Sequence, residues 1–338
     1  MKAVGLTRYL PINDPESLID IDLPMPQPEA RDLLVRVETI SVNPVDTKIR
    51  APKDKLESTP RVLGWDAAGV VESVGSEATL FKPGDAVYYA GEIGRPGSNS
   101  QFQLADERLV GRKPRTLDFA QAAALPLTTI TAYEALFERL GISADGADRG
   151  KSLLIIGAAG GVGSIALQLA RLAGLIVIGT VGRIETRRWT ASLGLQLTAD
   201  HGQPLPGQLA ALGHPEVDYV LNLNSTDRYW QVTAEVLRPQ GKVCSIVENS
   251  GPLDQSLYKS KSLTHAWEFM FTRAMFKTAD MIEQGRILNR VADWIDQNAL
   301  KPTLTETLSP INAANLRRAH ARLESGTTIG KLALSGWA

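Results

Sequence analysis

The stretch Leu153-Leu154-Ile155-Ile156-Gly157-Ala158-Ala159-Gly160-Gly161-Val162-Gly163 decides the fold of this 338-residue chain. Its four leading apolar residues predict a buried strand, and the glycine-rich segment after them predicts a sharp turn. Downstream, apolar residues recur with the spacing of one helix face: Val162, Ile165, Ala166, Leu169, Ala170 and Ala173. The stretch therefore predicts a strand, a turn and a helix in succession, which is the context that a dinucleotide-binding glycine pattern requires.

The turn matches a relaxed dinucleotide fingerprint in which alanine stands in place of the first glycine. Residues without a Cβ let the backbone approach a pyrophosphate closely, and the start of a helix offers unpaired N–H groups and the positive end of its dipole. The alternative is a tight strand-to-helix turn that binds no ligand. The residues expected to contact the cofactor are Ala158, Gly160, Gly161, Val162 and Gly163.

The end of the next apolar strand distinguishes between the two nicotinamide cofactors. The sequence Gly179-Thr180-Val181-Gly182-Arg183 contains no aspartate to bind the ribose 2′-hydroxyl of NAD. The first acid is Glu185, and arginines surround it. Because guanidinium groups bind phosphate well, the sequence favours NADP(H), with Arg183 as the first expected contact and Arg187 as the second. The alternative is a solvated helix start with surface arginines.

After Asp145-Gly146, continuous apolar strands alternate with helical segments, which predicts a parallel sheet covered on both faces. Ligands bind outside the carboxyl ends of such strands, so Asn222 and Val247 are expected to border the cofactor, and Thr180 is expected to face the adenosine phosphate together with Arg183. A helix over roughly 279–299 and a short β tail at 329–334 should follow. The expected strands are Leu153–Ile156, Ile176–Ile178, Tyr219–Leu221, Val243–Val247 and Leu263–Phe271.

Residues 1–125 have a different character. Short strand-like runs around Val35, at 69–74 and at 85–89 alternate with turns rich in proline and glycine, which predicts a partly open barrel or a sandwich. The pattern changes near Asp118, where an alanine-rich segment leads into helical composition. The chain as a whole is thus expected to be of the α/β class, with a β-rich region followed by a parallel sheet.

Charge and cysteine content narrow the classes of partner. The net charge is −1, so no field is present that would attract nucleic acid or an anionic membrane. The single thiol, Cys244, cannot form an intrachain disulfide, which fits a reducing compartment. No stretch approaches the roughly 20 apolar residues of a membrane helix. We therefore predict a cytoplasmic protein that acts on small molecules, without nucleic-acid or membrane partners.

The residues needed for a catalytic zinc site are scarce. Such sites typically use two cysteines and one histidine with water as the fourth ligand. Here Cys244 is the single cysteine, and the first histidine in the chain is His201. No cluster of acidic residues suggests another metal. The sequence therefore predicts no bound metal.

Five segments along nearly the whole chain carry recognisable motifs: Ser41–Arg50 (NPxDxxxR), Val62–Val71 (GxExxGxV), Ala124–Ala132 (ALPLTxLTA), Gly157–Gly163 (AAAGGVG) and Ile329–Leu334 (GKxVL). In this order they resemble the medium-chain dehydrogenase/reductase superfamily. Within it they are most similar to quinone oxidoreductases of the zeta-crystallin type and to the zinc-type alcohol dehydrogenase-like subgroup. Trp65 stands in the position of the zinc-ligand histidine of the metal-dependent branch, and Asp66 replaces its glutamate.

This resemblance implies a GroES-like domain over residues 1–126, completed by 278–338, and a Rossmann domain over 127–277. It also implies a homodimer formed through the last Rossmann strand near 263–271. The implied activity is NADPH-dependent, zinc-independent reduction of quinones or α,β-unsaturated carbonyls. Two alternatives stay open: a zinc-dependent alcohol dehydrogenase, or a non-catalytic NADPH-binding protein of the crystallin-like or RNA-binding kind.

The resemblance also suggests catalytic residues. Asn43 and Thr128 should lie beside the nicotinamide or the substrate. Lys48 occupies a position where some quinone reductases carry tyrosine, so it either stabilises an oxyanion, donates a proton or is an ordinary surface lysine. Asp46 is expected to order its loop, and the alternative for it is a catalytic role. Trp65 either lines the floor of the site or belongs to the core.

Overall fold

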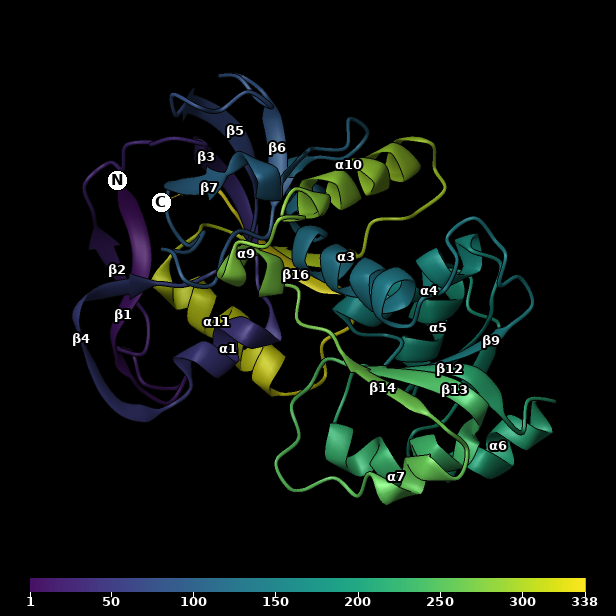
Figure 1. The fold of residues 1–338 in the computed structure, drawn as a ribbon. Coiled ribbons are helices and arrows are strands. Elements are labelled where there is room, and N and C mark those ends of the chain that lie inside the picture. Colours follow the sequence, from purple (N-terminus) through teal and green to yellow (C-terminus); the bar gives the residue numbers. More distant parts are fainter. Residues whose placement is uncertain (338) are drawn as a thin grey trace. The chain divides into compact units, whose positions relative to one another are not determined.

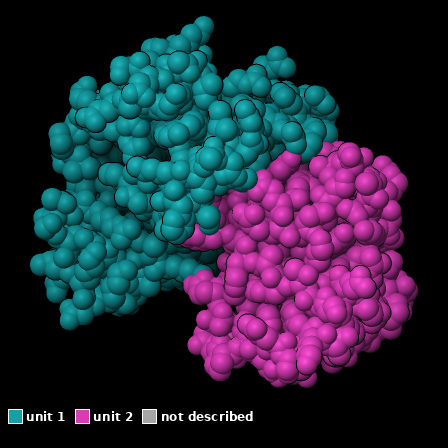
Figure 2. Space-filling model, in the orientation of Figure 1, with its two compact units in different colours: residues 1–130, 271–338 teal, residues 131–270 magenta. Residues whose placement is uncertain are grey.

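The chain forms two compact units, one of residues 1–130 and 271–338 and one of residues 131–270 (Figure 2). The computed structural model describes residues 1–337. The chain passes from the first unit to the second within helix α3 (Pro126–Tyr133) and returns directly before helix α9 (Thr272–Phe276). Each unit has its own sheet and its own core.

Unit 2 is built on six parallel strands in the order β11-β10-β9-β12-β13-β14. Helices α4 and α5 cover one face of this sheet and α6 and α7 cover the other (Figure 1). Its elements are the π-helix η2 (Glu134–Arg139), β9 (Ser152–Ile156), α4 (Gly161–Leu172), β10 (Ile176–Thr180), α5 (Ile184–Ser192), β11 (Leu197–Ala199), α6 (Leu205–Ala211), β12 (Val217–Asn222), α7 (Thr226–Val236), β13 (Leu237–Ser245), α8 (Ser256–Lys259) and β14 (Thr264–Trp267).

The strand order of unit 2 reverses between β9 and β12. The chain first moves outward through β10 and β11, and then returns to the other side of β9 to build β12, β13 and β14. Strands β9 and β12 are buried along their whole length, which explains their continuous apolar sequences. This reversal is the topological switch point at which open α/β sheets bind ligands.

Unit 1 contains a seven-stranded sheet and a separate three-stranded sheet, β2-β1-β4. The main path of the larger sheet is β15-β16-β3-β5-β6-β8, and β7 also pairs with β3. Its elements are β1 (Lys2–Tyr9), β2 (Ile19–Asp22), β3 (Asp32–Ser41), α1 (Pro44–Arg50), β4 (Lys53–Val62), β5 (Asp66–Val74), β6 (Ala86–Tyr89), β7 (Phe102–Asp106), η1 (Glu107–Leu109), β8 (Val110–Arg112), α2 (Phe119–Ala123), α9, α10 (Glu283–Asp296), β15 (Leu304–Leu308), α11 (Ala313–Glu324) and β16 (Lys331–Ser335).

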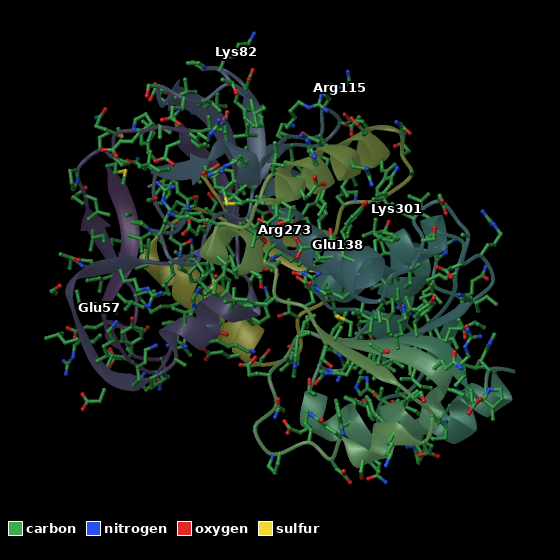
Figure 3. All side chains as sticks on the ribbon, viewed as in Figure 1. Glu57, Lys82, Arg115, Glu138, Arg273 and Lys301 are labelled. Atoms are coloured by element: carbon green, nitrogen blue, oxygen red, sulfur yellow. The ribbon has the colours of Figure 1, made fainter. Side chains whose placement is uncertain are left out.

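The C-terminal strand β16 lies inside the larger sheet, between β15 and β3. It pairs antiparallel with β3, where Ala333 lies opposite Ser41, and parallel with β15. Its side chains are buried up to Leu334, and the buried residues include the charged Lys331. By contrast, charged residues on turns of this unit, such as Lys82 and Arg115, project into solvent (Figure 3). The tail of the chain is therefore part of the core of unit 1.

The predicted order of a β-rich region and a parallel sheet is confirmed, with local differences. The last parallel strand ends at Trp267, earlier than predicted, and Phe271 precedes α9. The short strand β11 was not predicted, because its three residues carry too little periodicity. The predicted helix over 279–299 is the shorter α10. None of the helices within residues 1–337 has the length and apolar character needed to cross a bilayer.

Candidate functional site

The glycine-rich turn of unit 2 leaves β9 at Gly157, whose φ of 92° lies in the left-handed region. The N–H of Gly157 donates to the Thr180 hydroxyl at 2.9 Å, which ties the turn to the end of the neighbouring strand β10. Gly160 then caps α4 in an extended conformation. Gly160, Gly161 and Val162 are only half-buried, so the start of this 12-residue helix is accessible.

Close packing explains the last glycine of the turn. A Cβ on Gly163 would lie 2.4 Å from the carbonyl oxygen of Gly157 and 2.7 Å from the Cα of Ala158. Any side chain there would push the helix away from the turn. A Cβ on Gly160 would meet only one atom within 4 Å, the Gly157 oxygen at 3.6 Å. Gly163 thus serves helix packing, whereas the backbone at Gly160 leaves space for a ligand.

The other predicted residues of unit 2 lie at carboxyl ends of strands or just beyond them. Asn222 ends β12, is buried, and uses its amide to organise the following loop through Asn224 and Ser225. Val247 follows β13 by two residues, and its carbonyl accepts a hydrogen bond from the Thr226 hydroxyl. The Thr180 hydroxyl is engaged by Gly157, so its role in the structure is to hold the turn.

The basic segment follows β10 directly. Arg183 is the exposed N-cap residue of α5. His201 lies against the preceding residue, Gly182, because a Cβ added there would come within 2.6 Å of the His201 Nε2. Arg187 is half-buried and donates to the Thr198 hydroxyl of β11 at 2.9 Å. The sequence argument did not include His201, which lies 18 residues beyond Arg183 and is brought there by strand β11.

In unit 1, a buried polar network surrounds Asn43, the N-cap residue of α1. The Asn43 Nδ2 donates to the Asp66 Oδ2 at 2.8 Å, and its Oδ1 accepts from the Lys331 Nζ at 2.6 Å. The Lys331 ammonium also binds the Asp66 Oδ2 at 3.0 Å. The Asp66 Oδ1 accepts from the backbone N–H of Leu127 at 2.7 Å. All three side chains are at most 3% exposed.

Asp46 completes the start of α1. Its Oδ2 accepts from the backbone N–H of Asn43 at 2.7 Å, whereas its buried Oδ1 has no hydrogen-bond partner among residues 1–337. Burial raises the pKa of Asp46 from 3.8 to about 7, against the opposing effects of the Asn43 hydrogen bond and the Lys331 charge. The carboxyl group therefore orders the loop, as expected, and carries a proton over much of the acidic range.

The two other predicted catalytic residues have different environments. Thr128 is buried in α3, and its hydroxyl donates to the Leu125 carbonyl at 3.0 Å. It follows Leu127, whose N–H binds Asp66, so α3 starts from the same network. Lys48 is exposed at the other end of α1 and lines a surface pocket of about 470 Å³ with Arg50 and Glu324.

Unit 1 has few side chains that could bind a metal ion. Trp65 is fully buried, packs edge-on against Phe271 at 6.0 Å and donates its indole N–H to the Glu92 carbonyl, so its side chain belongs to the core. The only histidine of this unit is His320, whose pKa burial lowers to about 3. Cys244 lies buried in β13 of unit 2. Residues 1–337 contain no group of three or more His, Cys, Asp or Glu residues placed to hold a metal.

Sequence reasoning singled out Asn43 and Thr128 but missed the residues that hold them. Asp66 was noted only as the replacement of a glutamate, and Lys331 only as part of the closing motif. The sequence did contain a signal for these two residues. Charged residues are rarely buried, yet Asp66 lies among small and apolar residues and Lys331 lies in an apolar C-terminal segment. Each buried charge required a partner of opposite charge.

Comparisons with known proteins agree with this architecture. The alcohol dehydrogenase GroES-like domain family matches residues 29–115, and the zinc-binding dehydrogenase family matches residues 193–334. A zinc-type alcohol dehydrogenase-like protein of Staphylococcus epidermidis is 40% identical over 99% of both chains. The chloroplastic quinone-oxidoreductase homolog of Spinacia oleracea is 28% identical over 94% of this chain and 93% of its own.

A crystal structure from Rhizobium etli CFN 42, of a protein described as a candidate zinc-dependent alcohol dehydrogenase, is 50% identical to this chain. It superposes with a TM-score of 0.96 over 100% of this chain and 98% of its own. These matches confirm the expected combination of a GroES-like domain and a parallel-sheet Rossmann domain.

Replacing Asp46 by asparagine should change how stability depends on pH. The folded protein keeps the Asp46 proton up to about pH 7, whereas the unfolded chain loses it near pH 3.8, so the native carboxyl group destabilises the fold increasingly as the pH rises between these values. Asparagine keeps an acceptor for the Asn43 N–H but has no charge to desolvate. From pH 4.5 to pH 8, the unfolding free energy of Asp46→Asn should rise relative to wild type by about 3 kcal/mol.

Urea unfolding at the two pH values measures this difference. Asp54→Asn, at an exposed aspartate, is the matched control and should show little pH-dependent change relative to wild type. A difference between Asp46→Asn and wild type that stays constant with pH would show that Asp46 does not titrate in this range.

Proposed function

The chain belongs to the medium-chain dehydrogenase/reductase superfamily of oxidoreductases, and from this we propose that it is a zinc-independent reductase that uses NADPH to reduce quinones or α,β-unsaturated carbonyl compounds. The observation that carries the proposal is the donor set of unit 1. The position next to Asp66 holds a buried tryptophan, and the one histidine of the unit has a buried imidazole of lowered pKa. Zinc-alkoxide chemistry needs thiolate or imidazole ligands that this unit does not provide.

The turn of unit 2 has the properties that a dinucleotide requires. Gly160 caps a helix with no acidic residue in its first turn, and its own N–H donates to the Gly157 carbonyl at 3.3 Å. The N–H groups of Gly161 and Val162 and the helix dipole favour the pyrophosphate. The space above Gly160 and the tight packing of Gly163 correspond to two roles that glycines have in such turns. Asn222 and Val247 complete the proposed contacts at the neighbouring strands.

The segment after β10 supports the phosphorylated cofactor. Arg183 is exposed at the start of α5, and His201 lies next to Gly182. Thr180, which was also expected there, acts through the turn that its hydroxyl holds. We propose that Arg183 binds the 2′-phosphate and that Arg187, which is held by Thr198, contributes charge from the following turn.

Without a metal, the acceptor must already be electrophilic, as quinones and conjugated enones are. Bound NADPH supplies a hydride from C4 of its nicotinamide ring. The electron pair that the acceptor gains ends on its carbonyl oxygen, which gives an enolate or a hydroquinone anion, and a proton taken up from water completes the reduction. Asn43 donates an N–H to that oxygen, and Thr128 helps to position the acceptor. Lys48 is exposed on α1, and it is the residue that the sequence analysis suggested as a proton donor.

Initial rates with purified protein test the activity. NADPH oxidation should be faster with a quinone or an enal than with a simple ketone, whose reduction gives a secondary alcohol. Of these acceptors, only the quinone and the enal accept hydride readily without a Lewis acid. The metal content of the same preparation is measured in parallel. Zinc that is stoichiometric and required for turnover would support an alcohol dehydrogenase instead, and tight NADPH binding without turnover would support a non-catalytic role.

Arg183→Ala should weaken NADPH binding about tenfold while leaving NADH binding almost unchanged, because the lost contact involves only the 2′-phosphate. Arg188→Ala removes an exposed arginine of the same helix that has no proposed contact, and it is the matched control. Fluorescence titrations with both cofactors measure the dissociation constants. Equal losses for NADPH and NADH in Arg183→Ala would contradict the assignment.

We further propose a cytoplasmic homodimer formed through β14. This strand is the edge of the six-stranded sheet, and Glu268, directly after it, is buried and lies 2.9 Å from Arg139. Trp267 and Phe269, the two sequence neighbours of Glu268, are 44% and 46% exposed. Large apolar side chains beside an open edge favour pairing with a second copy of the chain.

Replacing Trp267 by glutamate should convert the dimer to a monomer, because a charge would then be buried in the new interface. Light scattering coupled to size exclusion should give twice the 36.6 kDa chain mass for wild type and a single chain mass for the variant. Leu56→Glu, at a 73% exposed leucine of β4, is the control and should remain dimeric. A monomeric wild type would contradict the proposal.

A further inference from the structure

Lys331 is a buried cation whose contacts all belong to the Asn43 network. Its ammonium donates to the Asn43 Oδ1 at 2.6 Å, to the Val42 carbonyl at 2.8 Å and to the Asp66 Oδ2 at 3.0 Å. It is 3% exposed, and Asp66 is 0% exposed. The lysine enters from the C-terminal strand β16, 288 positions away from Asn43 in the sequence.

We propose that Lys331 is a positioning residue for the reductase reaction: together with Asp66 it fixes the Asn43 amide and strengthens this amide as a hydrogen-bond donor to the acceptor oxygen that becomes negative. The inference rests on the proposed function. It adds a residue from the opposite end of the chain, with a defined electrostatic role.

The orientation of the Asn43 amide follows from the two charges beside it. The amide oxygen faces the ammonium group, and the amide nitrogen faces the carboxylate. A flipped amide would place its N–H groups against the ammonium group and its oxygen against the carboxylate, and both contacts would be repulsive. Because Nδ2 carries two hydrogens and one of them goes to Asp66, the other remains to be donated.

A positive charge at the amide oxygen has a chemical consequence. It draws electron density toward Oδ1 and makes the remaining N–H a stronger donor, and hydrogen-bonded chains polarise one another in this way in a low-dielectric interior. A donor that is already oriented stabilises developing negative charge without reorganising during the reaction. Asn43 would touch the acceptor, and Lys331 acts through Asn43.

The same carboxylate also fixes the second proposed catalytic residue. The Asp66 Oδ1 accepts from the N–H of Leu127 at 2.7 Å, in the first turn of α3, and Thr128 is the next residue. One charge-compensated carboxylate thus sets the positions of Asn43 and of the helix start that carries Thr128.

Stability alone does not explain a buried ion pair at this place. Removing two charges from water costs free energy, and replacing such a pair by neutral side chains of similar volume is often neutral or stabilising. Removing only one partner leaves an uncompensated charge and destabilises the fold strongly. A variant in which both charges are neutralised therefore separates a catalytic effect from a loss of folding.

The experiment compares wild type, Lys331→Met, the double variant Lys331→Met/Asp66→Asn and the control Lys113→Met. Lys113 also donates to backbone carbonyls of unit 1, those of Pro114 and Leu117, and lies outside the proposed site. For each protein, the thermal midpoint, the dissociation constant for NADPH and kcat with a quinone and with an enal are measured.

The double variant should fold and bind NADPH like wild type but lose about 10- to 100-fold in kcat with the enal. The loss with the quinone should be smaller, because a hydroquinone anion is less basic than an enolate and needs less stabilisation. Lys113→Met should retain wild-type kcat with both acceptors. Equal losses with the two acceptors, or no loss at all, would overturn the inference.

A readout that is independent of turnover separates this inference from the proposed function. In protein labelled with ¹⁵N, the Asn43 side-chain amide resonance, assigned by its disappearance in Asn43→Asp, should shift in the double variant and stay in place in Lys113→Met. If wild type reduces none of the acceptors, the proposed function fails. An unshifted Asn43 resonance in the double variant would overturn the positioning role of Lys331.

Discussion

The buried carboxylate of Asp66 sets how three segments of unit 1 are oriented. Its two oxygens accept hydrogen bonds from three segments that are distant in sequence: the cap of α1 at Asn43, the start of α3 at Leu127 and the C-terminal strand at Lys331. A carboxylate with no exposed surface must have its charge compensated, and Lys331 compensates it. The C-terminal strand is consequently needed for the electrostatics of the unit as well as for its sheet.

The two units prepare their proposed binding surfaces by different physical means. Unit 2 uses the backbone: glycines without a Cβ, a helix start with unpaired N–H groups, and the Thr180 hydroxyl that holds the turn. Unit 1 uses buried side chains whose charges determine one another's orientation. The residues of the glycine-rich turn in unit 2 are contiguous in the sequence. The side chains of the buried network in unit 1 come from distant parts of the sequence and meet only in the folded protein.

This difference explains which parts could be predicted from the sequence. The turn at 157–163, the parallel strands and the arginines after β10 are local patterns, and the structure has them where the sequence indicated. The Asn43–Asp66–Lys331 network spans 288 positions and has no local periodicity, so only the burial of single polar residues hinted at it. The end of β14 was misjudged for a related reason: the apolar residues 269–271 suggested that the strand continues, whereas the chain leaves the sheet after Trp267 and enters α9 at Thr272.

A second group of buried charged residues, in unit 2, shows that buried charge can also have a structural role. Glu134 in η2 and Glu268 after β14 are both buried in unit 2 beside Arg139. Burial, reinforced by the Glu134 charge, raises the pKa of Glu268 above its usual value, which favours a proton on this pair of acids and reduces the negative charge that Arg139 has to compensate. These residues join the first and last segments of unit 2. In unit 1, by contrast, the carboxylate and the ammonium group form a full ion pair around an amide. An amide held between opposite charges is an oriented and polarised donor, whereas the two acids beside Arg139 form a charge-compensated contact within unit 2.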